Sequence, residues 1–548
     1  MTAATATGRL AARAWRNSAR VDAQLGACVG RHSLGSGAER DARRSGAPVG
    51  ARHSAHAARR FSTARRGTMA DRGDSTKLTA EDLNRNAVEM EYSVRGKIVQ
   101  LAEEHQAALS RGEKRPFDEV ILCNVGNPQA VGQAPLTYLR QVLALCTYPA
   151  LLDEPSLAHC FPEDVVAEAK SILDNSKGVG AYTTSKGIPL VRQRVAKFLE
   201  ERDGYPADPE SILLTNGASD GVKAILTLMT RGPKDGIMIP IPQYPLYSAA
   251  SVLLDGAMLG YYLNEDQAWS LEVEELRRVV TSAKEKGVLP RVLCVISPGN
   301  PTGNLLTVQN MQDIVSFCEE QNLLLMADEV YQENIYDSTK EFVSFKKVVR
   351  DMNSDVPMVS FHSTSKGVMG ECGLRGGYME LVNLDDSVAA QVYKLQSVSL
   401  CANVPGQIAT NIMVNRPKPG SPSYELWEKE YNSTFQSLAR KADKLAKGLN
   451  AIPGVSCSDQ LFAMYAFPKI QLPPKAIQVA EKEGMAADAF YCMNLLQETG
   501  ICVVPGSGFL QVPGTFHFRT TILPPEDKMD SVIAKLRDFH MGFCEKYA

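Results

Sequence analysis

The sequence has no long apolar run and no surplus of positive charge. No stretch approaches the roughly 18 consecutive apolar residues that span a bilayer, which argues against a transmembrane protein. The twelve cysteines include no Cys-x-x-Cys pair, so neither a zinc site nor a disulfide framework is predicted, and free thiols in a reducing compartment are expected. With 59 basic and 62 acidic residues the net charge is −3, which excludes a generally basic nucleic-acid-binding protein.

What is present is an ordinary globular composition. Of the 548 residues, 44% are hydrophobic and 22% are charged. At roughly 100–200 residues per domain, this length accommodates three or four domains, or one large two-domain enzyme with additional segments. A chain of this length can bury a sizeable core.

The first 68 residues differ from the rest in charge. They contain thirteen arginines, no lysine and three acids, which gives +10 and leaves −13 for the remainder. An N-terminus rich in Arg and Ser and poor in acids is typical of a mitochondrial transit peptide, and it has too few large apolar residues to fold alone. Arg59-Arg60-Phe61-Ser62 resembles a matrix-processing site, with cleavage expected after Phe61. A disordered basic tail is the alternative, and Met69 offers an internal start for a cytosolic form.

After residue 69, short apolar runs alternate with amphipathic stretches. The pattern predicts strands over 211–215, 237–241, 292–296, 323–327 and 358–361, and helices over 219–230, 246–254 and 308–320. Such alternation predicts an α/β fold with a mostly parallel sheet covered by helices. Helical apolar spacing also extends over 78–109, and a long charged helix over about 423–449 follows a Pro-rich stretch at 416–422. Binding loops are expected at the carboxyl ends of the strands.

Several residues that could carry chemistry follow the predicted strands. Residues 215–219 join a strand to a helix through small residues, which lets backbone N–H groups approach an anion. The rigid loop 297–303 presents Asn300, and Asp328 follows an apolar strand with Tyr331 three residues further on. Taken singly these signals are weak, because such turns are common in α/β folds and acids at strand ends often cap helices.

Lys366 is the most unusual of these residues. It follows the last predicted strand, in Ser363-Thr364-Ser365-Lys366-Gly367, although lysine is seldom buried unpaired. Arg375 comes nine residues later, among glycines. A lysine amine can form a Schiff base when its pKa is lowered, and a nearby arginine can hold a phosphate. The ordered set of loop, Asn, Asp-x-x-Tyr, Ser-x-Ser-Lys and Arg is far more specific than any one member.

This set resembles the class I, fold-type-I pyridoxal-phosphate aminotransferases over about residues 80–548. The resemblance is carried by stretches such as LMADEVYQENIY, SFHSTSKGVMGECGLRGGYMEL and VPGQIATNIMVNRPKPG. In that family the phosphate arginine usually falls eight residues after the lysine. The spacing of nine found here is a feature of the branch that acts on alanine. The resemblance implies transfer of the amino group of L-alanine to 2-oxoglutarate by a ping-pong route through pyridoxamine phosphate, giving pyruvate and L-glutamate.

The resemblance also assigns roles to single positions. Lys366 would carry pyridoxal 5'-phosphate and move the substrate proton, and Asp328 would pair with the ring nitrogen. Arg519 would bind the substrate α-carboxylate, with the loop around Gly126 closing over it. The other cofactor contacts would come from Ala218, Ser219, Tyr244, Asn300, Tyr331, Ser363 and Arg375, and from Tyr182 of a neighbouring subunit in a homodimer. No metal, nucleic acid or membrane partner is implied.

The fold implied by the resemblance is α/β, with a large domain and a smaller α/β domain built from both chain ends. The expected division is a transit segment over 1–68, an N-terminal arm with part of the small domain over 69–155, a large cofactor-binding domain over 156–400 and a small C-terminal domain over 401–548. His362, Cys372 and Cys401 are interpreted as packed neighbours, and 506–508 as a turn, because no strand–glycine–helix context precedes it.

Three alternatives stay open at this point. One is a glyoxylate-accepting aminotransferase, which substrate competition would distinguish. Another is a lyase of the aminocyclopropane-carboxylate synthase type, which releases product without forming the pyridoxamine form. The third is a regulator that keeps the fold for ligand binding. It would normally bring a DNA-binding domain, and the N-terminal segment has no helix–turn–helix pattern.

Overall fold

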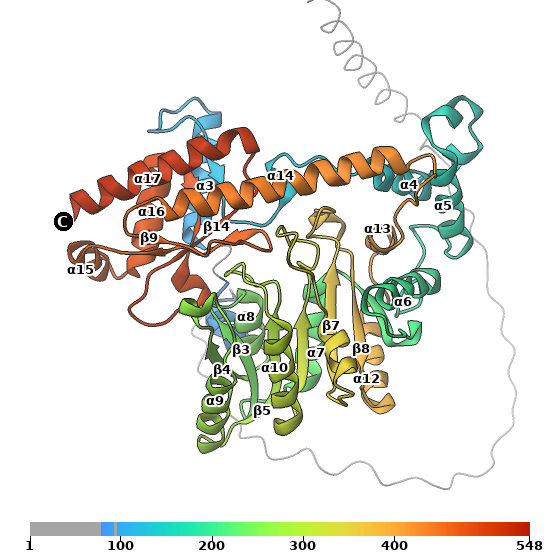
Figure 1. Ribbon diagram of the computed structural model, residues 1–548, viewed down its shortest axis with the longest axis horizontal. Coiled ribbons are helices and arrows are strands. Elements are labelled where there is room, and N and C mark those ends of the chain that lie inside the picture. The colour runs from blue at the N-terminus through green and yellow to red at the C-terminus, as the bar shows by residue number, and fades with distance from the viewer. Residues whose placement is uncertain (1–77, 93–95) are drawn as a thin grey trace, which may run out of the picture. The chain divides into compact units, whose positions relative to one another are not determined.

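The computed structural model describes residues 78–92 and 96–548 (Figure 1). The predicted transit segment 1–68, its cleavage point after Phe61 and the internal start at Met69 lie outside these residues. Within the described ranges, no helix combines the length and the apolar character that crossing a membrane requires. The cysteines of the described chain are free thiols.

The largest sheet of the described chain has seven strands. Its strands are β2 (Ile212–Thr215), β3 (Asp235–Ile241), β4 (Ala257–Tyr262), β5 (Leu289–Ile296), β6 (Leu324–Asp328), β7 (Met358–Ser363) and β8 (Gly377–Val382). Their order in space is β2-β8-β7-β6-β5-β3-β4. Strand β8 runs antiparallel to β2 and β7, and the other neighbouring pairs are parallel. The predicted mostly parallel sheet is therefore confirmed.

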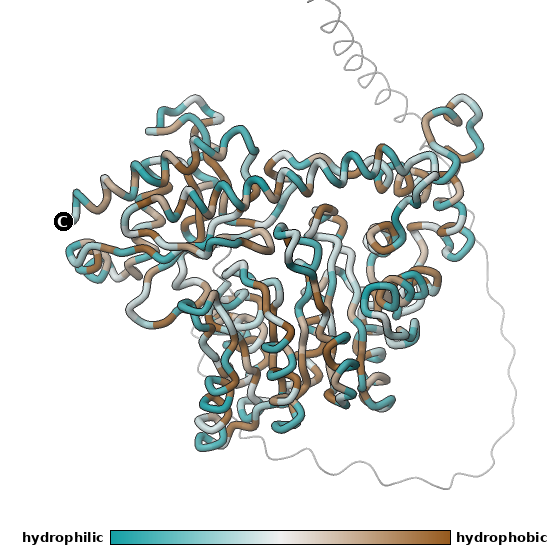
Figure 2. The backbone as a smooth tube through the Cα atoms, in the orientation of Figure 1, coloured by the Kyte–Doolittle hydropathy of each residue, from teal (hydrophilic) through white to brown (hydrophobic). Residues whose placement is uncertain are grey.

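Alternate side chains of the central strands enter two separate cores. On β5, Leu293 and Val295 face one core, whereas Cys294 and Ile296 face the other. A strand covered on both faces shows this alternation because successive side chains point to opposite sides of the sheet. Figure 2 shows the central strands as largely brown, hydrophobic segments. The covering helices are α9 (Val273–Glu285), α10 (Val308–Gln321) and α11 (Phe345–Asp351) on the first face, and α7 (Ala218–Met229), α8 (Pro245–Leu253) and α12 (Asp386–Ser397) on the second.

Some elements differ from the prediction. Strands β4 and β8 were not predicted: β4 is mostly half-buried, and the apolar pattern of β8 is broken by Glu380. That carboxylate is buried because Lys346 donates to it at 2.6 Å. The spacing over 78–109 does not form one helix, since α2 (Arg85–Glu89) and α3 (Lys97–Ser110) are separate and Gly96 caps α3.

A smaller group of elements is built from both ends of the described chain. Strand β1 (Ile121–Leu122) pairs in parallel with β12 (Ile501–Cys502). Strand β14 (Phe518–Thr521) lies between β10 (Tyr465–Ala466) and β13 (Val504–Pro505). The helices packed on these strands are α3, α14 (Tyr424–Asn450), α15 (Pro474–Lys482), α16 (Ala487–Thr499) and α17 (Met529–Lys546).

A third apolar core lies beside β2 and β8. Its helices are α4 (Thr137–Thr147), α5 (Glu163–Asp174), α6 (Pro189–Asp203) and α13 (Val404–Val414). The first half of α14 packs on this core through Trp427, and its second half joins the smaller group through Leu445 (Figure 1). Helix α14 thereby connects the two. The numerical domain limits at 155 and 400 stay a prediction.

Candidate active site

One edge of the large sheet collects the polar residues that the sequence singled out. Strands β2, β5, β6 and β7 end there, and the antiparallel β8 begins there. The loops at this edge and the smaller group of elements enclose a cavity of about 420 Å³. Its lining includes Gly126, Ala218, Ser219, Tyr244, Asn300, Asp328, Tyr331, Ser363, Lys366, Arg375 and Arg519. Tyr182 does not line it, and 77% of that side chain is exposed.

Lys366 reaches across the cavity toward the loop after β1. Its Nζ donates a hydrogen bond to the carbonyl oxygen of Gly126 at 3.0 Å, and it lies 5.6 Å from the centre of the Tyr331 ring. A Cβ at position 126 would overlap the Tyr465 hydroxyl and approach Nζ to 3.1 Å. A side chain at position 126 would therefore have to displace the Tyr465 hydroxyl.

Asp328 is the last residue of β6 and is buried. The Tyr247 hydroxyl donates to its Oδ2 at 2.9 Å, whereas Oδ1 is buried without a hydrogen-bond partner. Burial raises the pKa of Asp328 to about 6, against the opposing effects of Tyr247, the Val330 N–H and the Lys366 charge. A buried oxygen without a partner is costly, so Asp328 offers an open acceptor to a donor group in the cavity.

The beginning of α7 and the guanidinium of Arg375 lie together at one corner of the cavity. Gly217 precedes the helix with φ of 78°, and a Cβ there would lie 2.5 Å from Arg375 Nη2. That nitrogen donates to the carbonyl of Asn216 at 2.9 Å and to the Ser219 hydroxyl at 3.2 Å. The first N–H groups of a helix have no intrahelical acceptor, and together with an arginine they favour a phosphate.

The two serines before Lys366 differ in what they can still bind. The Ser363 hydroxyl accepts from the Ser365 N–H at 3.1 Å and donates to the Gly376 carbonyl at 3.3 Å. The Ser365 hydroxyl lines the cavity, is buried and has no partner. The Ser365 hydroxyl is therefore open to an anion, and the phosphate contact expected of Ser363 stays a prediction.

Arg519 lies on β14 and only 1% of it is exposed. Its Nη1 donates to the side-chain oxygen of Asn300 at 3.0 Å, and its Nη2 donates to the Asn124 carbonyl. The guanidinium carbon lies 4.3 Å from the centre of the Tyr465 ring and 4.6 Å from that of Phe509. No carboxylate of the described chain pairs with it, and its buried Nε has no partner. A buried guanidinium held by neutral groups is suited to a carboxylate ligand.

Two further tyrosines, Tyr92 and Tyr465, line the cavity and were not predicted from the sequence. The Tyr331 hydroxyl donates to that of Tyr465 at 3.2 Å, and the Tyr92 hydroxyl lies 3.2 Å from that of Tyr244. Burial raises the pKa of Tyr465, but the charges of Lys366 and Arg519, together with the hydrogen bond from Tyr331, lower it below its usual value. Neither position stands in a motif, and only the pairing of β10 with β14 brings Tyr465 to the site.

Residues 140–536 match the family model described as "Aminotransferase class I and II". The chain belongs to this family. Among the relatives of this aminotransferase is "Alanine aminotransferase 2-like" of Danio rerio, 51% identical, with 86% of this chain and 87% of the relative covered. "Alanine aminotransferase 1, mitochondrial" of Arabidopsis thaliana is 49% identical, with 86% and 88% covered.

Solved structures support the fold of this aminotransferase. The alanine aminotransferase from Pyrococcus furiosus superposes with a TM-score of 0.67 over 84% of this chain and 100% of that chain, at 22% identity. An aminotransferase from Escherichia coli gives a TM-score of 0.66 at 23% identity, with 84% and 98% covered. At such identities the likeness shows the fold alone. The fold predicted from the resemblance is confirmed.

His362, the buried residue before Ser363 on β7, is expected to make the fold of this aminotransferase sensitive to acid. Its ring lies edge-on to Tyr378 at 5.7 Å, and burial together with the Arg202 charge lowers its pKa to about 3. In the unfolded chain the imidazole binds a proton near pH 6.5. The unfolded state therefore gains protons first, and the free energy of unfolding falls as the pH drops from about 6.5 toward 3.

The matched variant is His362→Phe, which keeps a ring beside Tyr378 and cannot titrate. Between pH 6.5 and 5 the wild-type free energy of unfolding should fall by about 2 kcal/mol more than that of the variant. Urea denaturation of both proteins at each pH measures the difference. If the free energy of unfolding fell equally with pH in both proteins, His362 would not be held neutral in the fold.

Proposed function

We propose that this aminotransferase uses pyridoxal 5'-phosphate to transfer the amino group of L-alanine to 2-oxoglutarate, giving pyruvate and L-glutamate. The observation that carries the proposal is one cavity lined by Lys366, Asp328 and Arg519. It occurs in a chain about half identical to alanine aminotransferases over 86% of its length. An amine, a buried carboxylate and a buried guanidinium are the three groups that this chemistry needs.

The groups left open in the cavity fit the cofactor. Asp328 Oδ1 is a buried acceptor without a donor, as a protonated ring nitrogen would require. The Ser365 hydroxyl is a buried group without a partner, and it lines the cavity with Ser219 and Arg375, where a phosphate would be held. Lys366 would bind the cofactor's carbonyl carbon. When bound, the cofactor supplies an electron sink for the substrate carbanion.

The chain's own residues then have separate tasks. An ionised Asp328 keeps a facing ring nitrogen protonated, because a neighbouring cation lowers the pKa that burial has raised. The Lys366 amine, once free, would take the proton from the substrate α-carbon and deliver it to the cofactor's carbonyl carbon, as general base and then general acid. Arg519 orients the α-carboxylate through its planar fork. It serves both amino acids, because alanine and glutamate share that carboxylate.

We also propose a homodimer in which Tyr182 completes the partner's phosphate site. The side chain is 77% exposed and lies outside its own cavity, as a residue that serves a second copy would. Location in the mitochondrial matrix is proposed as well. It is supported by the +10 charge of residues 1–68 and by relatives from Arabidopsis thaliana that are named mitochondrial. Cleavage after Phe61 and a cytosolic form from Met69 belong to the same proposal.

The experiment that tests the activity uses the full chain loaded with pyridoxal phosphate. L-Alanine added without any oxo acid should remove the visible absorbance band of the cofactor, and 2-oxoglutarate should restore it. A band that ignores alanine would contradict the proposed substrate. Restoration by glyoxylate in preference to 2-oxoglutarate would favour a glyoxylate-accepting enzyme. Product release with no change in the band would identify a lyase.

A further inference from the structure

A second cavity lies at the opposite edge of the large sheet, near the first residues of β5, β6 and β7. It encloses about 720 Å³, and small-molecule sites measure about 300–1,000 Å³. Its walls come from the end of α7, from α9, from the end of α10 and from the start of α12. It shares no lining residue with the active-site cavity, so the two are separate spaces.

Most of the wall of this second cavity is apolar and part of it is open to water. Leu228 and Met229 come from α7, and Leu324 comes from β6. At its rim, Leu289 is 48% exposed and Val388 is 42% exposed. A contiguous apolar surface that stays open in a folded protein is a mark of a binding site.

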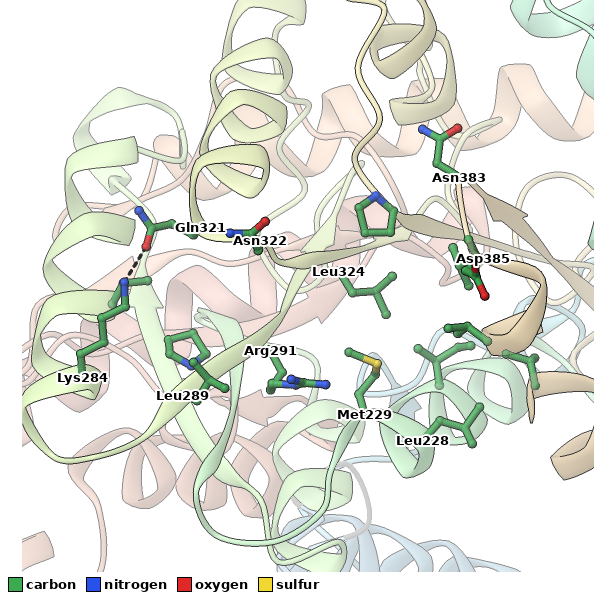
Figure 3. Close-up of a pocket in the computed structure, with 17 residues that line it drawn as sticks. Leu228, Met229, Lys284, Leu289, Arg291, Gln321, Asn322, Leu324, Asn383 and Asp385 are labelled. Atoms are coloured by element: carbon green, nitrogen blue, oxygen red, sulfur yellow. Dashed lines mark hydrogen bonds between the residues drawn. The ribbon is translucent and has the colours of Figure 1, made fainter. Parts of the chain in front are cut away.

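Arg291 places an unused charge within this apolar wall. Figure 3 shows its side chain in the middle of the cavity, between Leu289 and Met229. Its Nε is buried without a hydrogen-bond partner, and no carboxylate of the described chain forms a salt bridge with it. The charge of Arg291 lowers the pKa of Asp235, but that carboxylate already forms a salt bridge with Arg231 at 2.8 Å.

Four of the other polar side chains of the cavity, those of Lys284, Gln321, Asn383 and Asp385, already have partners. Lys284 donates to Gln321 at 2.9 Å, as the dashed line in Figure 3 marks. Asp385 caps α12 by accepting from the Ser387 N–H at 2.8 Å, and Asn383 donates to two backbone carbonyls. Arg291 is therefore the group that a ligand would satisfy, because a half-buried guanidinium beside apolar side chains is costly without an anion.

We propose that this cavity binds a medium-chain fatty carboxylate, with its head on Arg291 and its alkyl chain along the apolar wall. The planar fork of arginine matches a carboxylate, and a neutral apolar molecule would leave that charge unpaired. The chain's own first 68 residues are a poor occupant, because their charge of +10 repels Arg291. The proposal does not depend on the reaction at the other edge of the sheet.

The test is calorimetric titration of the full chain with decanoate and, as a neutral match, decanol. We expect decanoate to bind the wild type at least about tenfold more tightly than decanol, because only decanoate pairs with the guanidinium. Arg291→Leu should weaken decanoate by at least about tenfold and Arg291→Lys by less. Leu228→Trp, which fills the cavity, should weaken both ligands.

The matched control is Arg277→Leu, which removes the same charge from a surface position on α9 where Arg277 pairs with Glu320. It should bind decanoate as the wild type does. The proposal is overturned if the wild type does not bind decanoate, if decanol binds equally well, or if Arg291→Leu and Arg277→Leu have the same affinity. Since the two ligands are compared on the wild type, the test stands even if a variant fails to fold.

Discussion

Replacing Lys366 by alanine should lower the turnover of L-alanine with 2-oxoglutarate by at least about 10⁴-fold and leave the fold intact. The side chain would be both the cofactor anchor and the group that moves the proton, and no other amine lines the cavity among the described residues. Its one hydrogen bond, to the Gly126 carbonyl, contributes little to stability. Coupled assay of pyruvate formation measures the loss, and circular dichroism checks the fold.

Two further variants make this result specific. Lys366→Arg keeps a cation at the same place but cannot release its proton, so it should be as inactive as the alanine variant. Lys447→Ala removes a surface lysine that pairs with Asp443 and should behave as the wild type. Near-normal turnover by either Lys366 variant would remove this residue from the mechanism.

Arg519→Leu should lower kcat/KM for L-alanine and for 2-oxoglutarate alike, by on the order of 10²-fold. The Arg519 guanidinium is buried on the side of the cavity that the smaller group of elements forms. Both substrates would present the same α-carboxylate to it. Steady-state kinetics with each substrate varied in turn measures the two losses. A loss confined to one substrate would place the carboxylate anchor elsewhere.

Arg519 also joins structural elements, so the fold needs its own control. The variant leaves the Asn124 carbonyl and Asn300 without their donor, and its thermal midpoint should be compared with that of Arg519→Lys, which keeps the charge. Arg537→Leu removes an exposed arginine from α17 and should leave both kcat/KM values unchanged. A drop in activity that follows stability across these variants would contradict a role in binding.

The edge of the large sheet could be predicted because it depends on local signals. Apolar runs that alternate with amphipathic stretches give the strands, and residues that follow parallel strands share one edge. Asn300, Asp328 and Lys366 meet there for that reason. Strand β8 was not predicted because Glu380 breaks its apolar pattern. The buried Glu380 carboxylate is paired with Lys346, which lies 34 positions away in the sequence.

The other half of the site depends on contacts that no local pattern contains. Tyr465 reaches the cavity only because β10 pairs with β14, and Tyr92 only because its hydroxyl meets that of Tyr244. The choice between Ser363 and Ser365 depends on which hydroxyl the surrounding backbone already occupies. The unpaired state of Arg291 is likewise a property of its neighbours and not of its own motif.

The parallel pairing of β1 with β12 has a consequence for the order of synthesis. Ile121 has no strand partner until Ile501 has been translated, and Arg519 emerges later still. The large sheet is complete at Val382, so a nascent chain can assemble the edge that carries Asp328 and Lys366 well before Arg519 is translated. A ribosome that stops between these points would release a chain with the Asp328 and Lys366 side of the cavity and without its Arg519 side.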